Sequence, residues 1–406
     1  MTDQFTVKKA TAGREGILIA LGSSLTIMGS VMVAPMLPKM GQEFGPVTPD
    51  AGTLLPLAVT GPALAIALFA PIAGWISDRV GRKAMLILAT FLYAILGVLP
   101  ALLTDLNDIV ISRLLFGCAE AVIMTCCTAL IADYWHGEER FKFVNFQVVS
   151  IGIIGSIFFV LGGVMGEESW RTPFYLYLGP LLLIPFMVRI LWEPKKNSGH
   201  LPPVDPNAHT AFAPLIIGYL MILGGMVLNF IVPVQAPALL VAMGVTSTTK
   251  IGLSAGLGLL ATLGGSLTWP LLRRLFGLSG CNALLMALLA VGLWLLANAE
   301  TYNQVLFAVC IHGLGAGLMV PNLMASVMNA LPDSVRGRGI GGFTSALYLG
   351  QFISPIVVGT IIAMTQTDLP SAIVYLSIAS AVVAAIWLLS RLLGGKSQPL
   401  NKESAA

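Results

Sequence analysis

The chain has 406 residues, of which 56% are apolar and only 10% charged, against about 25% charged in an average soluble protein. A soluble domain of this length cannot bury so much apolar surface in its own core, so the composition predicts an integral membrane protein. The net charge of +3 is small and the basic residues are spread over loops, which argues against nucleic acid as a partner. The five cysteines all lie in apolar runs without metal-ligand spacing, so we expect no metal site and no disulfide framework.

About twelve apolar segments are long enough to cross a bilayer as helices, at roughly 20 residues per crossing. They lie near 16–38, 52–76, 84–103, 107–132, 144–166, 173–192, 211–233, 251–272, 279–298, 303–328, 340–363 and 370–393. The polar N-terminus runs straight into the first segment, so that segment, and not a cleavable signal peptide, is expected to direct insertion. The hydrophilic stretch 193–210 separates six spans from six. It predicts a cytoplasmic linker between a first bundle, 1–192, and a second bundle, 211–406, that ends in a cytoplasmic tail.

The orientation follows from the positions of lysine and arginine. If the N-terminus is inside, nearly all basic residues fall on the cytoplasmic face, and only Lys39, Arg171 and Lys250 fall on the other. The positive-inside rule therefore predicts that both termini lie in the cytoplasm. We expect a multi-pass protein of the cytoplasmic (inner) cell membrane.

A charged turn joins the second and third spans, with the sequence Gly74-Trp75-Ile76-Ser77-Asp78-Arg79-Val80-Gly81-Arg82-Lys83. The pattern G-x-x-x-D-R-x-G-R-K closely resembles motif A of the major facilitator superfamily, the loop between helices 2 and 3. The resemblance implies an all-α fold of twelve transmembrane helices in two pseudo-symmetric six-helix bundles. It also implies a gating latch that favours the state closed to the cytoplasm.

For the latch, Asp78 is expected near the start of span 11 at Gly339, where helix amides stabilise a carboxylate. Arg82 or Lys83 is expected to pair with Asp133, which closes span 4 on the same face. The alternative is a positive-inside anchor without a gating role. That alternative explains Arg79 and Lys83, but it does not explain the acid.

The two halves of the chain resemble an internal repeat. Adding 196 maps Gly81 to Gly277, Gly117 to Gly313, and Arg140 to Arg336. Parallel repeats related by an axis along the membrane normal are the architecture of the superfamily. The second copy of motif A is degraded, because Arg274 stands where the first copy has its acid.

Span 4 contains two ionisable residues, Arg113 and Glu120, around Gly117. Seven residues on a helix amount to about −20° of rotation and a rise of about 10 Å, so both side chains leave one face. R-x-x-x-G resembles motif B of the family, whose arginine is linked to proton coupling. A carboxyl at the midplane is costly to ionise, which makes Glu120 a candidate proton carrier. The alternative is a structural acid that stays protonated or paired with Arg113.

The second half offers weaker candidates. His312 lies beside Gly313 and is the best titratable group there, because no acid falls within a span of that half. A neutral histidine bonded to a neighbouring helix is the alternative. Four polar side chains are candidates for the substrate pathway or for interhelical hydrogen bonds: Asn229, Gln235, Asn322 and Gln351.

Span 5 carries several glycines that partly resemble motif C of the antiporters: Gly152, Gly155, Gly162 and Gly163. The expected Gly-Pro is missing, since Ser156 follows Gly155, and this weakens the case for export. The glycines also allow close helix approach without any role in transport direction.

These features together predict a secondary transporter of the drug/proton antiporter-like branch. We expect proton-coupled efflux of a small, amphipathic organic molecule by alternating access, from a cavity between the halves at the midplane. A proton-coupled importer on the same fold is the alternative. No nucleotide-binding loop or HExxH occurs, and the single GxSxG match, at 252–256, falls inside a predicted span and not on a strand-to-helix turn. An ATP-driven pump and a membrane enzyme are therefore disfavoured, and no cofactor is expected. The expected partners are the substrate, protons and the lipid bilayer, around a monomer.

Overall fold

A computed structural model describes residues 13–194, 211–332 and 335–393, and these residues form helices without any β-strand. The helices of the N-terminal half are α1 (Arg14–Val31), η1 (Ala34–Met36), α2 (Leu37–Phe44), α3 (Ala51–Val80), α4 (Arg82–Val98), η2 (Leu99–Ala101), α5 (Leu106–Tyr134), α6 (Gly137–Met165), η3 (Thr172–Leu183) and α7 (Ile184–Ile190). Those of the C-terminal half are α8 (Phe212–Asn229), α9 (Ile231–Ala242), α10 (Thr248–Ala297), α11 (Tyr302–Asn329), α12 (Arg336–Thr365) and α13 (Leu369–Leu393). The linker expected at 193–210 lies outside the described residues apart from its first two.

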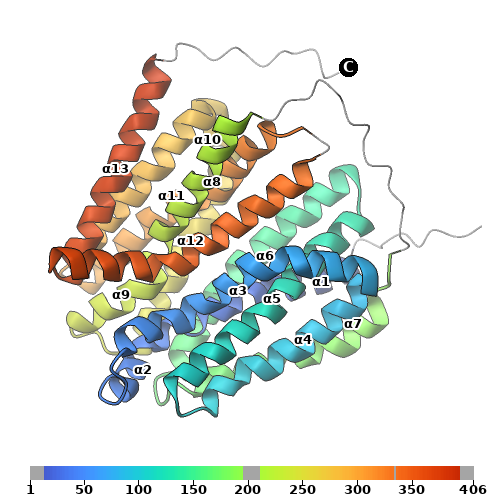
Figure 1. Ribbon diagram of the computed structural model, residues 1–406, viewed down its shortest axis with the longest axis horizontal. Helices are drawn as coiled ribbons and strands as arrows, with labels where there is room; N and C mark the ends of the chain where they lie inside the picture. Colours follow the sequence, from blue (N-terminus) through green and yellow to red (C-terminus); the bar gives the residue numbers. More distant parts are fainter. Residues whose placement is uncertain (1–12, 195–210, 333–334, 394–406) are drawn as a thin grey trace, which may run out of the picture.

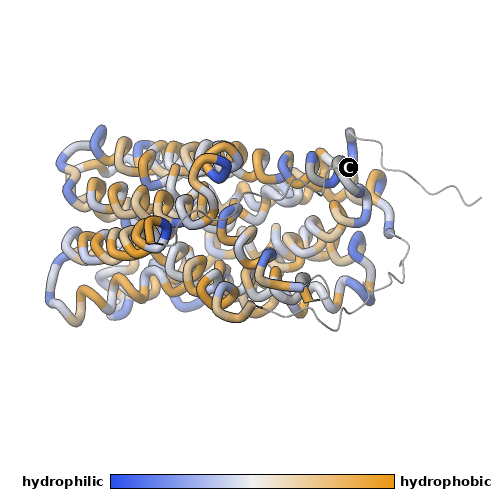
Figure 2. Tube along the Cα trace, turned by 90° about the horizontal axis from the view of Figure 1, so that it is seen from above, coloured by the Kyte–Doolittle hydropathy of each residue, from blue (hydrophilic) through white to orange (hydrophobic). Residues whose placement is uncertain are grey.

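Within the described ranges, 11 helical stretches are long and apolar enough to cross a membrane. One of them, α10, contains two spans, because Gly277 interrupts it with φ 69° and ψ −177°. The twelve crossings expected from the sequence are therefore present, and the all-α membrane fold is confirmed. Figure 2 shows the same pattern, with hydrophobic residues along the helices and hydrophilic residues gathered at their two ends.

The two halves lie side by side and repeat one another in detail (Figure 1). Gly81 and Gly277, which the offset of 196 relates, both adopt positive φ at the turn between two spans. Gly117 packs on the carbonyl oxygen of Pro62, and its counterpart Gly313 packs on that of Gly258, again 196 residues later. A side chain at either glycine would separate the same pair of helices in its half.

Span 6 departs from the ordinary helix that the sequence predicts. Residues Thr172–Leu183 form a 3-10 helix, and only Ile184–Ile190 are α-helical. Pro173, Pro180 and Pro185 explain the change, because each removes a backbone donor and crowds the preceding turn. Span 1 is likewise broken by η1, which contains Pro35, before it continues as α2.

Because successive spans reverse direction, the helix ends fall on two faces. We call the face that holds the start of α1 and the end of α13 the terminal face, and the other the opposite face. At the opposite face the two halves meet where α2 and η1 pack against α9. In the interior they meet where α6 packs against α10 and where α3 packs against α12.

Candidate transport site and gating contacts

Arg113 lies in the middle of the N-terminal half and is completely buried. Its Nε donates to the carbonyl oxygen of Ala58 in α3 at 3.2 Å, and its Nη2 donates to that of Gly29 in α1. The guanidinium carbon lies 4.3 Å from the ring centroid of Phe116, which adds a cation–π contact. Nη1 has no hydrogen-bond partner, so the charge is held by carbonyl dipoles and an aromatic face and keeps one free donor.

Glu120 is 2% exposed and, among the described residues, makes neither a hydrogen bond nor an ion pair within 4.0 Å. The carboxylate lies directly against Gly29. A Cβ on that glycine would come 2.8 and 2.9 Å from the two Glu120 oxygens. The structure thus brings Arg113 and Glu120 together at one residue of α1, since one bonds the carbonyl oxygen of Gly29 and the other packs on its Cα.

Aromatic rings from α4, α5 and η3 lie beside this pair. Tyr93, Phe116 and Tyr177 are buried, and their ring centroids lie 4.4 to 5.7 Å apart. Tyr93 donates to the carbonyl oxygen of Leu25 at 2.7 Å, and Tyr177 donates to that of Met28 at 3.0 Å. These bonds fix α1 beside α4 and η3. Sequence analysis missed Gly29, Tyr93 and Tyr177, because a glycine or tyrosine in an apolar run gives no signal until its neighbours are known.

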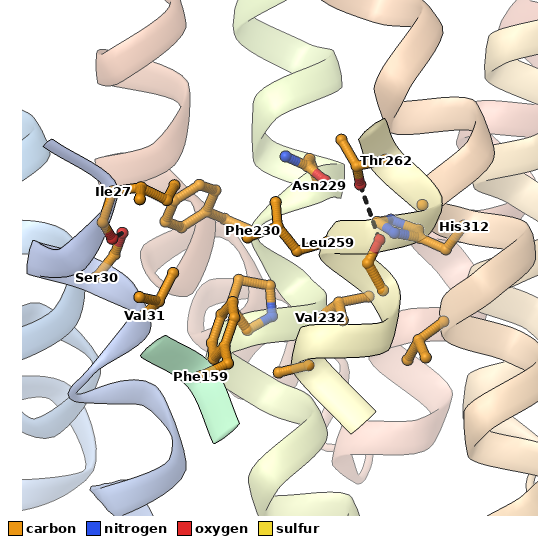
Figure 3. Close-up of a pocket in the computed structure, with 15 residues that line it drawn as sticks. Ile27, Ser30, Val31, Phe159, Asn229, Phe230, Val232, Leu259, Thr262 and His312 are labelled. Carbon is orange, nitrogen blue, oxygen red and sulfur yellow. Dashed lines mark hydrogen bonds between the residues drawn. The ribbon is translucent and has the colours of Figure 1, made fainter. Parts of the chain in front are cut away.

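A cavity of about 100 Å³ lies between the two halves, on the other side of α1 (Figure 3). The N-terminal half contributes Ile27, Ser30, Val31 and Phe159 to its lining. The C-terminal half contributes Asn229, Phe230, Thr262 and His312 with several aliphatic residues. No charged side chain lines it. The space therefore suits an uncharged or weakly polar molecule with aromatic or aliphatic surface.

His312 is 2% exposed and lies on α11 at the edge of this cavity (Figure 3). The imidazole forms a hydrogen bond with the backbone of Leu228 in α8, while Nε2 has no partner. A ring bonded on one nitrogen to a backbone carbonyl is fixed in orientation. Nε2 is the buried nitrogen that this bond leaves without a partner among the described residues.

The remaining polar candidates separate into two groups. Asn322 is fully buried and satisfied within its own half, since its amide donates to Leu278 O at 3.1 Å and Asn282 Oδ1 at 2.7 Å and accepts from Trp269 Nε1 at 3.1 Å. It holds helices together and does not reach the cavity. Asn229 lines the cavity, whereas Gln235 and Gln351 are half-buried on α9 and α12 and do not line it.

The motif A residues form a network at the terminal face. Arg82 pairs with Asp78 at 2.9 Å and with Asp133, the partner expected from the sequence. Asp78 is 61% exposed in its side chain, and among the described residues it accepts a hydrogen bond from Arg82. Gly74 packs against Thr125 of α5, and Arg79 stacks on the ring of Trp75 at 3.5 Å. Lys83 donates to the carbonyl oxygen of Val188 at 2.8 Å.

Glu193 adds a contact that the motif alone does not reveal. Its two carboxylate oxygens accept the backbone N–H groups of Arg82 and Lys83 at 2.6 and 2.9 Å. These are unpaired donors of the first turn of α4, where the helix dipole also favours an anion. The residue that follows span 6 therefore caps span 3 and joins Asp78, Arg82 and Asp133 in what we call the terminal-face cluster.

Another set of bonds joins the two halves at the opposite face. Glu167, after α6, accepts from the Ser247 hydroxyl and from the Thr249 N–H at 2.9 Å, at the start of α10. Lys39 of α2 donates to Gly166 O at 2.9 Å and to the Glu167 carbonyl. The Ser247 hydroxyl, with the Thr249 donors and the Lys39 charge, outweighs burial and lowers the pKa of Glu167 to about 2. We call Lys39, Glu167, Ser247 and Thr249 the opposite-face contact.

The glycines of span 5 form the interior part of the same interface. Gly155 packs on Leu259, and Gly163 packs on the backbone of Thr248, both in α10. The Thr248 hydroxyl donates to the carbonyl oxygen of Gly163 at 2.7 Å. The glycines therefore let two spans from different halves approach closely. Close helix approach was the alternative to a role in transport direction in the sequence analysis.

Two helical bundles around a midplane cavity, with bonded contacts at both faces, define a membrane transporter. The family model of the Major Facilitator Superfamily matches residues 19–281 and 221–405, so the chain belongs to this superfamily. The assignment indicated by motif A is confirmed, and the protein is a transporter and not an enzyme.

Two relatives are similar over most of the chain. The quinolone resistance protein NorA of Staphylococcus aureus (strain MSSA476) is 24% identical over 352 residues, 83% of this chain and 87% of its own. The 3-(3-hydroxy-phenyl)propionate transporter of Escherichia coli (strain K12) is 24% identical over 307 residues, 72% of this chain and 74% of its own.

Solved structures share the fold. A bacterial homologue of the human lysosomal transporter Spinster, in an inward-facing and unoccupied conformation, superposes with a TM-score of 0.71. It is 15% identical, and the match covers 97% of this chain and all of that one. A D-xylose-proton symporter has a TM-score of 0.71 at 16% identity and covers 95% of this chain and 97% of its own.

Proposed function

We propose that this transporter moves a small, uncharged or amphipathic organic molecule outward across the cell membrane in exchange for protons. In this proposal both termini lie in the cytoplasm, as the distribution of basic residues predicts. Substrate occupies the cavity between the halves, and Glu120 carries the proton. Arg113 supplies the positive charge that stabilises the ionised carboxylate during part of the cycle.

The observation that carries the proposal is the position of Glu120. A carboxyl at the centre of a spanning helix, 2% exposed and without an ionic partner within 4.0 Å among the described residues, is expensive to keep ionised. A purely structural acid is expected to be paired or bonded. This one lies against a bare glycine backbone, where a small movement of α1 changes its surroundings.

The cavity lining supports the proposed substrate class. Phe159 and Phe230 offer aromatic surface, and Ser30, Thr262 and His312 offer a few polar groups. Such a lining binds apolar molecules with one or two hydrogen-bonding atoms and gives little support to a permanently charged one. Similarity to a quinolone resistance protein is consistent with outward transport of aromatic compounds.

An importer is the second candidate. It is favoured by the missing proline after Gly155. The cavity and Glu120 serve either direction equally. The sign of substrate movement under an imposed pH gradient distinguishes the two candidates.

The test of coupling uses Glu120→Gln in proteoliposomes. The amide keeps the volume and mimics the protonated acid, so we expect uphill transport driven by a pH gradient to be lost. Exchange of substrate between compartments of equal pH should survive, because that mode needs no net proton release. The matched control is Glu300→Gln, an exposed acid at the opposite face. If Glu120→Gln still concentrates substrate under the same pH difference, Glu120 is not the coupling acid and His312 becomes the next candidate.

A further inference from the structure

A second cavity, of about 360 Å³, lies inside the C-terminal half at its terminal-face end. It is bounded by α8, the second span of α10, α11 and α13, and neither Glu120 nor the transport cavity contributes to it. The apolar lining includes Pro214, Ile217, Met221, Leu323 and Trp387. Trp387 Nε1 donates to Met221 Sδ at 3.4 Å, and this contact lies at the deep end of the cavity. The shallow end begins at Ala211, which is exposed at the start of α8.

The internal repeat explains why this space is empty. In the N-terminal half the equivalent positions, 196 residues earlier, hold Leu86, Leu130 and Tyr134, all buried. The C-terminal half has Asn282, Ser326 and Ala330 instead, and all three line the cavity. Three large side chains have thus been replaced by smaller or more polar ones at one place in an otherwise parallel packing.

The depth of the cavity matches an acyl chain. Its lining runs along α8 from residue 211 to residue 221, which at 1.5 Å per residue is about 15 Å. The hydrocarbon core of a bilayer is about 30 Å thick, so the cavity is as deep as one leaflet. The deep end is apolar, whereas the polar residues Ser279 and Asn329 belong to the shallow end.

The mouth of the cavity is basic. Arg391 lies one turn beyond Trp387 on α13, and its guanidinium rests against Gly280, next to Ser279 of the lining. Arg273 and Arg274 lie on the neighbouring turn of α10 and are exposed. The described residues of the C-terminal half contain two acids, Glu300 and Asp368, and both lie at the opposite face. No ion pair within the described chain involves any of these three arginines.

We infer that this cavity binds one acyl chain of an anionic phospholipid, with the lipid phosphate held by Arg391 and by Arg273 or Arg274. Guanidinium groups bind phosphate oxygens in a bidentate manner, and basic sites between helices at the cytoplasmic surface suit anionic headgroups. The bound lipid fills the space that Leu130 and Tyr134 fill in the other half. It therefore stabilises the C-terminal bundle at the face where that bundle must move.

Trp387 is the probe for the test. The full-length protein, stripped of lipid in detergent, is titrated with phosphatidylglycerol brominated on one acyl chain, because bromine quenches tryptophan on contact. The part of the quenching that disappears in Trp387→Phe reports occupancy of the cavity. We expect the Trp387-dependent quenching to saturate with phosphatidylglycerol. Brominated phosphatidylcholine of the same chain composition should need at least a tenfold higher concentration to reach the same quenching.

Three variants complete the test. Arg391→Gln should raise the phosphatidylglycerol concentration for half-quenching about fivefold, since one basic residue near an anionic surface contributes about 1 kcal/mol. Arg189→Gln, at the terminal face of the other half, should leave it unchanged. Ala330→Tyr, which restores the side chain of the other half, should abolish the Trp387-dependent quenching. If that variant does not fold, Ser326→Leu serves the same purpose. Equal quenching by the two lipids, or no quenching that depends on Trp387, overturns the inference.

Discussion

Gly29→Ala tests the contact between α1 and Glu120, the proposed coupling carboxyl, directly. A Cβ at this position comes 2.8 and 2.9 Å from the Glu120 oxygens and 2.9 Å from Phe116 Cε1. Phe116 is fully buried beside Tyr93 and Tyr177 and cannot retreat, so the carboxylate has to move. Overpacking of this kind costs about 1–3 kcal/mol. Alanine regains about 1 kcal/mol of helix propensity over glycine, which leaves a net destabilisation of up to about 2 kcal/mol.

The matched control is Gly22→Ala, two turns earlier in α1. Its Cβ meets Cys127 Sγ at 3.2 Å and Met187 Cε at 3.6 Å, so the neighbours need to move only slightly. We expect its stability to be unchanged or slightly raised. Adding Glu120→Ala to Gly29→Ala removes the clashing oxygens. The double mutant should therefore recover about 1–2 kcal/mol relative to the sum of the single changes.

Stability is measured by denaturant titration of the purified protein, and coupling is measured by pH-driven uptake into proteoliposomes. We expect Gly29→Ala to lose uphill transport while Gly22→Ala retains it. Wild-type stability and full coupling in Gly29→Ala would refute the reasoning, because they would show that the space beside Glu120 is not constrained by α1.

Three further predictions concern the faces of the molecule. Arg82→Gln removes both ion pairs of the terminal-face cluster. Because these groups are partly exposed, we expect the stability to fall by about 1 kcal/mol or less and transport to become slower. Lys142→Gln, which changes an exposed base on α6, is the control, and unchanged flux in Arg82→Gln would show that the cluster has no gating role. A cysteine placed in 193–210 should react with an impermeant thiol reagent only after the membrane is opened, and labelling of intact cells would reverse the proposed orientation. Glu167→Gln should lengthen the distance between spin labels at Val47 and Glu300 in part of the population. The pKa of Glu167 is lowered to about 2, so the stability that its ionised carboxylate gives to the opposite-face contact is complete above about pH 4.3 and is lost as the pH falls from there through 2. The distances should therefore be the same at pH 8 and pH 5. A difference between these two pH values that Glu167→Gln removes would contradict this.

Much of the fold could be predicted from the sequence, because span length and turn chemistry are local properties. The charged turn at 74–83 and the glycines at 81 and 277 specify the reversals of both halves. The 3-10 helix of span 6 was missed, although its prolines at 173 and 180 are visible in the sequence. Hydropathy measures how apolar a segment is and carries no information about its hydrogen-bond register.

The site was predictable only where ionisable residues interrupt an apolar run. Arg113, Glu120 and the Arg82–Asp133 pair stand out for that reason. Gly29 and Glu193 do not, because their roles depend on which helix packs against them, and a one-dimensional pattern does not contain that information. For Asn322 the sequence left open a place in the substrate pathway or an interhelical hydrogen bond, and the bonds within its own bundle agree with the second.

The continuous stretch from Gly29 to Lys39 lies beside the proposed proton carrier, the cavity and the contact between the halves at the opposite face. Gly29 touches the proposed proton carrier, and Ser30 lines the cavity. Lys39, reached through the 3-10 segment Ala34–Met36, bonds the opposite-face contact. That contact does not titrate near neutral pH, because Glu167 remains ionised there. In the proposed mechanism, proton release therefore acts on this contact from a distance. A change in the charge of Glu120 would act on the turn of α1 beside the cavity, and α1 would carry the displacement to Lys39, so that proton and substrate bias one movable element.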